Sequence, residues 1–177
     1  MAAGVLQRQQ GPARPVGRAR PAVLAALLMG LSGCNDMADM VIFSELHGQV
    51  VTAGAPVAGA KVERSWKWDL TGENGSDAAT TDAEGRFSLP AVARRAGLRR
   101  WLPHEPFVEQ TIRVAHAGQS TDVWMLDKRN YRAGGEMGPD KAAPALVVTF
   151  TLDAPLAHNG PVYGRATIDN PPAGAAQ

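Results

Sequence analysis

The residues best suited to metal or acid–base chemistry are scattered along this chain. A zinc site needs several His, Cys, Asp or Glu side chains that converge on one ion. The best local cluster is His104 beside Glu105, and its position between Pro103 and Pro106 indicates a loop pair. No histidine has a second one at a tight ligand spacing, and the four are His47, His104, His116 and His158. We therefore predict no metal site.

Hydrolytic chemistry has little support in the sequence. The chain has no GxSxG motif, which would mark a serine nucleophile. Asp82 and Glu84 lie in an expected turn and are more simply turn residues. Carboxylates that cleave glycosides stand roughly 5 to 10 Å apart, and only the fold sets that separation. We predict no catalytic residue and no cofactor, and keep a small hydrolase as the alternative.

The single cysteine stands where an apolar run ends. The run covers residues 21–31 and is shorter than the roughly 20 residues that a membrane-spanning helix needs. Residues 31–34 read LSGC and resemble a bacterial lipobox, in which cleavage before the cysteine leaves its thiol to carry a lipid. The preceding segment is basic without an acidic residue, as in signal peptides: Arg8, Arg14, Arg18 and Arg20. We therefore predict a lipoprotein signal peptide over 1–33 and a covalent lipid on Cys34.

The alternative is a secretory or uncleaved segment in which Cys34 is an incidental free thiol. An unpaired thiol in an exported protein is a liability that lipidation removes. Cleavage leaves 144 residues, one domain by length, and the formal net charge falls from +1 to −3. Such a chain does not suit nucleic acid, which demands excess Lys and Arg. In lipoprotein sorting an Asp directly after the cysteine is associated with inner-membrane retention; Asn35 stands there and favours the outer membrane.

The mature chain reads as a β-domain. Short alternating runs separated by Gly, Pro and Asp turns predict an all-β antiparallel sandwich of about seven strands. We expect strands or hairpins over 43–51, 58–68, 80–89, 106–126 and 145–153. Asp82 can bond the turn backbone, and Gly85 can take a positive φ. Residues 91–102 predict one short helix and 127–143 a long loop. The domain then covers 41–153, after a tether over 34–40 and before an extended, partly disordered tail over 154–177.

Two clusters are candidate binding sites. Alternation places Arg64, Trp66 and Trp68 on one face of the strand over 58–68. They form an aromatic and cationic ledge if that strand extends past the core, or fill the core if it does not. A second cluster is either a solvated basic loop or a surface for acidic head groups or an acidic partner: Arg94, Arg95, Arg99, Arg100 and Trp101.

The segments LHGQVVTAGAPVAGAKV (46–62) and TTDAEGRFSLP (80–90) resemble the carboxypeptidase regulatory-like domain, a transthyretin-like β-sandwich. The strand that ends at Gly48 and the turn around Asp82 and Gly85 carry the resemblance. Together with SELHG, ERSWKW and LPHEP, they look still closer to an uncharacterised group of bacterial proteins, many with lipoprotein leaders. The resemblance implies a non-catalytic folding or binding module.

The sequence therefore predicts an envelope lipoprotein, anchored in the membrane through its lipid, that binds or assists an envelope protein partner. Inhibition of an envelope enzyme belongs to the same class of function. A carbohydrate-binding module and a small envelope hydrolase are the alternatives from other classes. A flat exposed tryptophan face would mark the first, and convergent carboxylates or histidines in a pocket would mark the second.

Overall fold

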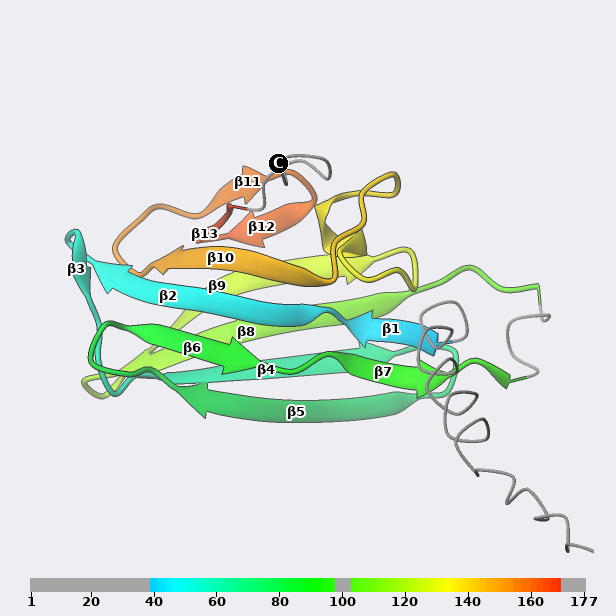
Figure 1. Ribbon diagram of the computed structural model, residues 1–177, viewed down its shortest axis with the longest axis horizontal. Coiled ribbons are helices and arrows are strands. Elements are labelled where there is room, and N and C mark those ends of the chain that lie inside the picture. Colours follow the sequence, from blue (N-terminus) through cyan, green and yellow to red (C-terminus); the bar gives the residue numbers. More distant parts are fainter. Residues whose placement is uncertain (1–38, 98–102, 170–177) are drawn as a thin grey trace, which may run out of the picture. The chain divides into compact units, whose positions relative to one another are not determined.

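The computed structural model describes residues 39–97 and 103–169. Within these ranges nearly all regular structure is β, and the strands form two layers that face each other (Figure 1). The predicted all-β sandwich is confirmed. The described strands number thirteen, more than the seven expected, because several are only two to four residues long.

One layer is a six-stranded sheet with the order β11-β12-β9-β8-β4-β5, in which every pair is antiparallel. The β8–β9 hairpin is closed by Ala117 and Gly118, both at positive φ (48° and 76°), as a two-residue hairpin turn requires. The strands of this sheet are β4 (Lys61–Trp68), β5 (Glu73–Thr80), β8 (Val108–His116), β9 (Gln119–Lys128), β11 (Ala157–Asn159) and β12 (Val162–Gly164).

The facing layer joins two smaller sheets. In the first, β2 pairs in parallel with β10 and antiparallel with β3 and β6, while β13 pairs with β10. In the second, β1 pairs with β7. The single residue Ser44 connects β1 to β2. The strands are β1 (Asp39–Phe43), β2 (Glu45–Thr52), β3 (Ala55–Pro56), β6 (Arg86–Leu89), β7 (Val92–Arg95), β10 (Ala145–Thr151) and β13 (Ala166–Ile168).

The core lies between the layers and follows the two-residue period of the strands. In β4 the inward positions Val62, Arg64 and Trp68 are buried and the alternate positions are exposed. Phe87 and Phe150 stack with ring centroids 5.4 Å apart. The ring of Phe87 lies directly over Gly48, where any side chain would overlap it, so glycine permits this close approach.

The turn over 81–85 differs from the predicted hairpin. Asp82 Oδ1 accepts hydrogen bonds from the amides of Glu84 (3.0 Å) and Arg86 (2.7 Å), and Gly85 has φ 72°. However, β5 pairs with β4 while β6 pairs with β2. The turn therefore carries the chain from one layer to the other.

The predicted helix over 91–102 is wrong for its first half. Residues 92–95 form β7, because the backbone of β1 offers them a strand to pair with, and this pairing outweighs a weak local helical preference. Residues 98–102 lie outside the described ranges. A 3-10 helix, η2 (Gly135–Met137), lies instead in the long loop between β9 and β10.

The segment after residue 153 also differs from the expected extended tail. Its residues up to 168 form β11, β12 and β13, which pair with each other, with β9 and with β10. These three-residue strands are too short to show a periodic pattern in sequence. The folded domain thus extends to at least residue 168.

Candidate functional site

Arg64 lies at the centre of a buried polar network. Its side chain is fully buried, and its guanidinium forms a bidentate ion pair with the carboxylate of Asp77 on β5. It also donates to the carbonyls of Ser44 (3.3 Å) and Pro90 (2.7 Å), and it lies 4.8 Å from the ring centroid of Phe43. One side chain thus ties β4 and β5 to the facing layer.

Trp68 is also part of the core. It is 1% exposed, and its indole nitrogen donates to the hydroxyl of Tyr131 at 2.9 Å. Burial raises the pKa of the Tyr131 hydroxyl, and the hydrogen bond from Trp68 opposes that shift. The exposed ledge considered for Arg64, Trp66 and Trp68 is therefore not formed, because the facing layer covers the inner side of β4.

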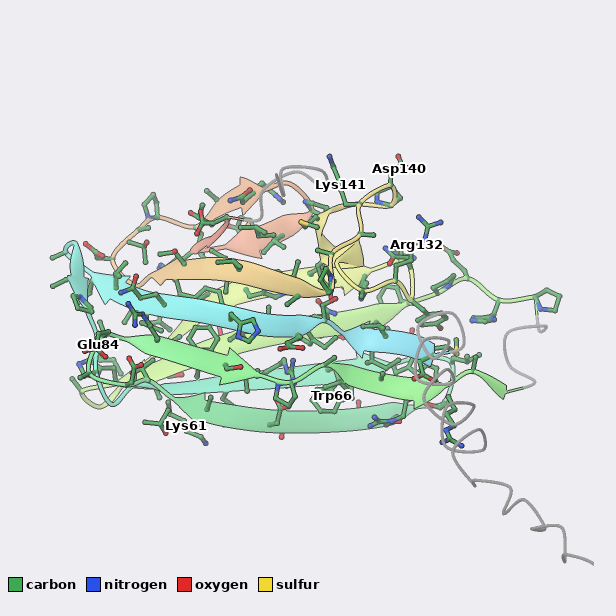
Figure 2. All side chains as sticks on the ribbon, viewed as in Figure 1. Lys61, Trp66, Glu84, Arg132, Asp140 and Lys141 are labelled. Atoms are coloured by element: carbon green, nitrogen blue, oxygen red, sulfur yellow. The ribbon has the colours of Figure 1, made fainter. Side chains whose placement is uncertain are left out.

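Trp66 is half-buried near the edge of the same sheet, beside β5 (Figure 2). Its ring lies over Gly75, which leaves room for it by having no side chain. Its indole nitrogen lies 3.4 Å from Glu73 Oε1, and Glu73 also pairs with Arg94 on β7 (Nε to Oε2, 3.1 Å). Trp66 and Arg94, predicted in separate clusters, thus share one carboxylate.

The rest of the arginine cluster is only partly described. Arg95 is exposed at the end of β7, while Arg99, Arg100 and Trp101 lie outside the described residues, as does Cys34 with its leader. No helix within 39–97 or 103–169 is long and apolar enough to cross a membrane. Over the same ranges no three His, Cys, Asp or Glu side chains come together as a metal site.

The outer face of the six-stranded sheet carries an uncharged row across all six strands. Strand register places its members directly opposite one another: His158, Tyr163, Met125, Thr111, Ser65 and Ser76. The rings of His158 and Tyr163 are in contact, with centroids 4.8 Å apart. The row therefore has aromatic and thioether groups at one end and three hydroxyls at the other.

Charged rows flank this uncharged row on both sides. One contains Asn74, Lys67, Glu109 and Asp127, and the other contains Ala78, Glu63, Arg113 and Asp122. Arg113 donates to Asp122 at 2.6 Å in the second row. Opposite charges on adjacent strands stabilise such a face only modestly, so these side chains remain free to exchange partners with a ligand.

A depression of about 520 Å³ lies over the hydroxyl end of this face. Its lining is mostly polar: Glu63, Ser65, Lys67, Asn74, Ser76, Glu109 and Thr111, with Trp66 and Gly75. It is broad and open to solvent. An open, polar sheet face of this kind can bind a surface or an extended ligand, and we call these residues the outer-face site.

A second buried network, which the sequence reasoning missed, joins β8, β9 and the long loop. Glu136 and Lys128 are both fully buried at their side chains and form an ion pair of 3.0 Å. Glu136 also accepts from the amide (2.9 Å) and hydroxyl (2.6 Å) of Ser44 and from Gln110 Nε2 (3.1 Å). Burial lowers the pKa of the Lys128 ammonium, while Glu136 raises it.

The signal for this network was the paired glycines that precede Glu136. Gly134 has φ 73°, and a side chain there would overlap the backbone at Ala143. A side chain at Gly135 would overlap Asn130, which itself bonds the Gly135 carbonyl at 3.0 Å. The two glycines let the loop fold tightly enough to bring Glu136 inside. Arg132, Asp140 and Lys141 of the same loop point outward (Figure 2).

The described part of the chain is thus a β-sandwich with a polar outer sheet face and two buried charged networks. It belongs to the family known as a domain of unknown function, DUF6795, whose model matches residues 46–143, more than half of the chain. The match includes β4, β5, β8, β9 and Glu136. A comparison with curated proteins gives no match.

Two solved structures show a weak likeness. The 3-chlorocatechol 1,2-dioxygenase from Rhodococcus opacus 1CP is 19% identical with a TM-score of 0.33, over 60% of this chain and 56% of that one. The catechol 1,2-dioxygenase from Pseudomonas arvilla C-1 is 22% identical with a TM-score of 0.30, over 77% of this chain and 51% of that one. The chain spans about half the length of these enzymes, and a likeness at these scores carries no argument about function.

Proposed function

We propose that this protein is a lipid-anchored envelope lipoprotein whose β-sandwich is a non-catalytic module that binds an envelope protein partner through the outer-face site. The signal-peptide pattern and the lipobox at Cys34 support the anchor. The identity of Asn35 supports the outer membrane. The observation that carries the binding role is the open polar depression of about 520 Å³ over β4, β5 and β8.

The chemistry of this surface supports a protein partner. Hydroxyl, amide and charged groups of both signs stand side by side in the depression: Glu63, Ser65, Lys67, Asn74, Ser76, Glu109 and Thr111. Such a surface offers donors and acceptors that fix the orientation of a partner, and its exposed charges set the encounter rate and specificity. Tyr163, 37% exposed at the far end of the uncharged row, adds an aromatic group of the kind enriched at interfaces.

We also propose a finer assignment of the fold. We place the sandwich in the carboxypeptidase regulatory-like, transthyretin-like group. Gly48 with Phe87 over it, and the Asp82 to Gly85 turn that leads to β6, support this assignment. Both features serve packing and chain direction, which suits a module that acts by binding.

The alternatives have less support. Carbohydrate binding was expected to show as a flat exposed tryptophan face, but among the described residues Trp68 and Trp124 are buried and Trp66 is half-buried, while Trp101 lies outside them. A small hydrolase needs acid and base groups that converge in a pocket. Glu63 and Glu109 line the outer-face depression, but both are exposed to solvent, and the buried carboxylate, Glu136, lies in the interior.

In-cell photo-crosslinking tests the proposal. A photoreactive phenylalanine analogue is placed at position 65, in the centre of the depression, in the full-length lipidated protein. The matched control carries it at position 147, where Val147 is 45% exposed on the outer side of β10 in the opposite layer. We expect a discrete crosslinked protein from position 65 that position 147 does not give. Identical products from both positions, or no protein product from position 65, would contradict the assigned face.

A further inference from the structure

Glu136 bridges an amine and a carboxamide in the interior of the sandwich. Its Oε1 accepts from Lys128 Nζ at 3.0 Å and from Gln110 Nε2 at 3.1 Å. Lys128 and Gln110 are each 1% exposed, and Glu136 is fully buried. A carboxylate hydrogen-bonded to both nitrogens can take a proton from one and give it to the other without the help of solvent.

The two strands place the amine close to the carboxamide. Val108 pairs with Lys128 and Gln110 pairs with Leu126, so Gln110 and Lys128 are diagonal neighbours on β8 and β9. All four positions are buried and thus share the inner face. Diagonal neighbours on adjacent antiparallel strands lie about 7–8 Å apart at the backbone, within reach of two long side chains that extend towards the same atom.

The carboxamide of Gln110 is held in one orientation. Its Nε2 also donates to the carbonyl of Ile42 at 2.8 Å, and since both partners of Nε2 are acceptors, the amide cannot be reversed. Its Oε1 is buried and has no hydrogen-bond partner among the described residues. Attack at Cδ would place negative charge on this oxygen without a hydrogen-bond donor from the described residues to stabilise it, so any reaction of the carboxamide is expected to be slow.

The surroundings of Lys128 shift it towards the neutral amine, which is the form that can act as a nucleophile. Burial lowers the pKa of Lys128, and transfer of its proton to Glu136 converts two buried charges into two neutral groups. Ser44 keeps Glu136 in position through its amide and hydroxyl (2.9 and 2.6 Å), and that hydroxyl accepts from the amide of Gly134 at 2.8 Å. The carboxylate is therefore fixed from two segments.

From this geometry we infer that Lys128 and Gln110 are a self-modification site at which an internal isopeptide bond forms, with Glu136 as the proton-transfer residue. Glu136 takes a proton from the Lys128 ammonium, and Nζ attacks Cδ of Gln110. The Nζ–Cδ bond forms, the Cδ–Nε2 bond breaks, and the departing nitrogen gains one proton in net terms. The products are a secondary amide, one molecule of ammonia and a protonated Glu136, so no co-reactant is required.

Peptide mapping of the native full-length protein tests this inference. The chain is purified from membranes, denatured and digested with trypsin, which cleaves after Lys and Arg. The bond blocks cleavage at Lys128 and joins peptide 101–113 to peptide 114–129. We expect the joined pair at one ammonia less than the summed mass of its two peptides. A contiguous peptide left uncut at Arg113 is distinguishable, because without the bond it differs from that sum by one water.

Three variants define the site. Lys128→Arg removes the attacking amine but keeps the charge, and Glu136→Gln removes the proton carrier; both should give separate peptides. The matched control is Lys61→Arg, an exposed lysine on β4 outside the buried network, which should keep the joined pair. Separate, unmodified peptides from the folded wild-type protein, even after prolonged incubation, would overturn the inference. A joined pair that persists in folded Glu136→Gln would overturn the role of Glu136.

Discussion

Arg64 connects the two layers of the sandwich from a single buried guanidinium. Its partners are a carboxylate on β5 and two carbonyls at the junctions of the facing layer, at Ser44 and Pro90. Buried charges are tolerated when they are paired and hydrogen-bonded, and here all three guanidinium nitrogens donate hydrogen bonds. Ser44 contacts both Arg64 and Glu136, so it joins the two buried networks.

Loss of Arg64 should therefore destabilise the domain strongly. We expect Arg64→Ala to lower the free energy of unfolding by about 3 kcal/mol, the lower end for a broken buried pair because Asp77 stays partly hydrated. Urea denaturation measures this. The matched control is Lys61→Ala on the same strand, which breaks only an exposed pair with Glu63 and should cost less than about 1 kcal/mol. Equal losses for both variants would contradict the role given to Arg64.

The alternation of β4 was readable from the sequence, and so was the placement of Arg64 with Trp68 on one face. Alternation alone could not say whether that face is covered. The groups that cover it come from residues far along the chain, including Ser44, Pro90 and Tyr131. Burial of Arg64 was thus a tertiary outcome. Glu136 was missed because Gly134 and Gly135 indicate a tight turn but do not show that the acidic residue after them is buried.

At the scale of elements, the turn between β5 and β6 decides where the chain changes layer. Gly85 has φ 72°, and a Cβ there would lie 2.6 Å from the carbonyl oxygen of Val50. Gly54 has a similar φ of 77° with nothing within 4 Å of a Cβ. The two positions share the conformational cost of a side chain in the left-handed region, about 1–2 kcal/mol, but not the clash.

Thermal or urea unfolding of two alanine variants separates these effects. We expect Gly54→Ala to lose about 1 kcal/mol and Gly85→Ala to lose clearly more, since Val50 lies in a central strand and cannot move aside. Equal losses for the two variants would contradict the role given to the close approach of Gly85 to Val50.

The elements themselves were predictable where a strand showed a long alternating run, as in β4, β8, β9 and β10. The prediction failed where a segment becomes a strand only because it pairs with another strand. Residues 92–95 have a weak helical pattern but meet the free backbone of β1, and β11 to β13 are too short to show any period. The parallel pairing of β2 with β10 joins segments about 100 residues apart and has no local trace either.

At the scale of the whole molecule, the proposed anchor decides where the outer-face site acts. We expect Cys34→Ala to move the protein from the membrane pellet to the soluble fraction, because the lipid is the proposed attachment. Fractionation with immunodetection measures this. The matched control in the leader is Ser32→Ala, two residues earlier, which should stay membrane-bound. Unchanged partition of Cys34→Ala would refute the anchor.

If the outer-face site binds a protein partner, exchanging charges within the site should weaken the position-65 crosslink. Lys67→Glu combined with Glu109→Lys exchanges two residues that face each other on β4 and β8, so the cross-strand attraction is kept. We expect an unchanged melting temperature and a crosslinked product reduced at least several-fold. A product of undiminished yield from the swapped protein would contradict binding through the outer-face site.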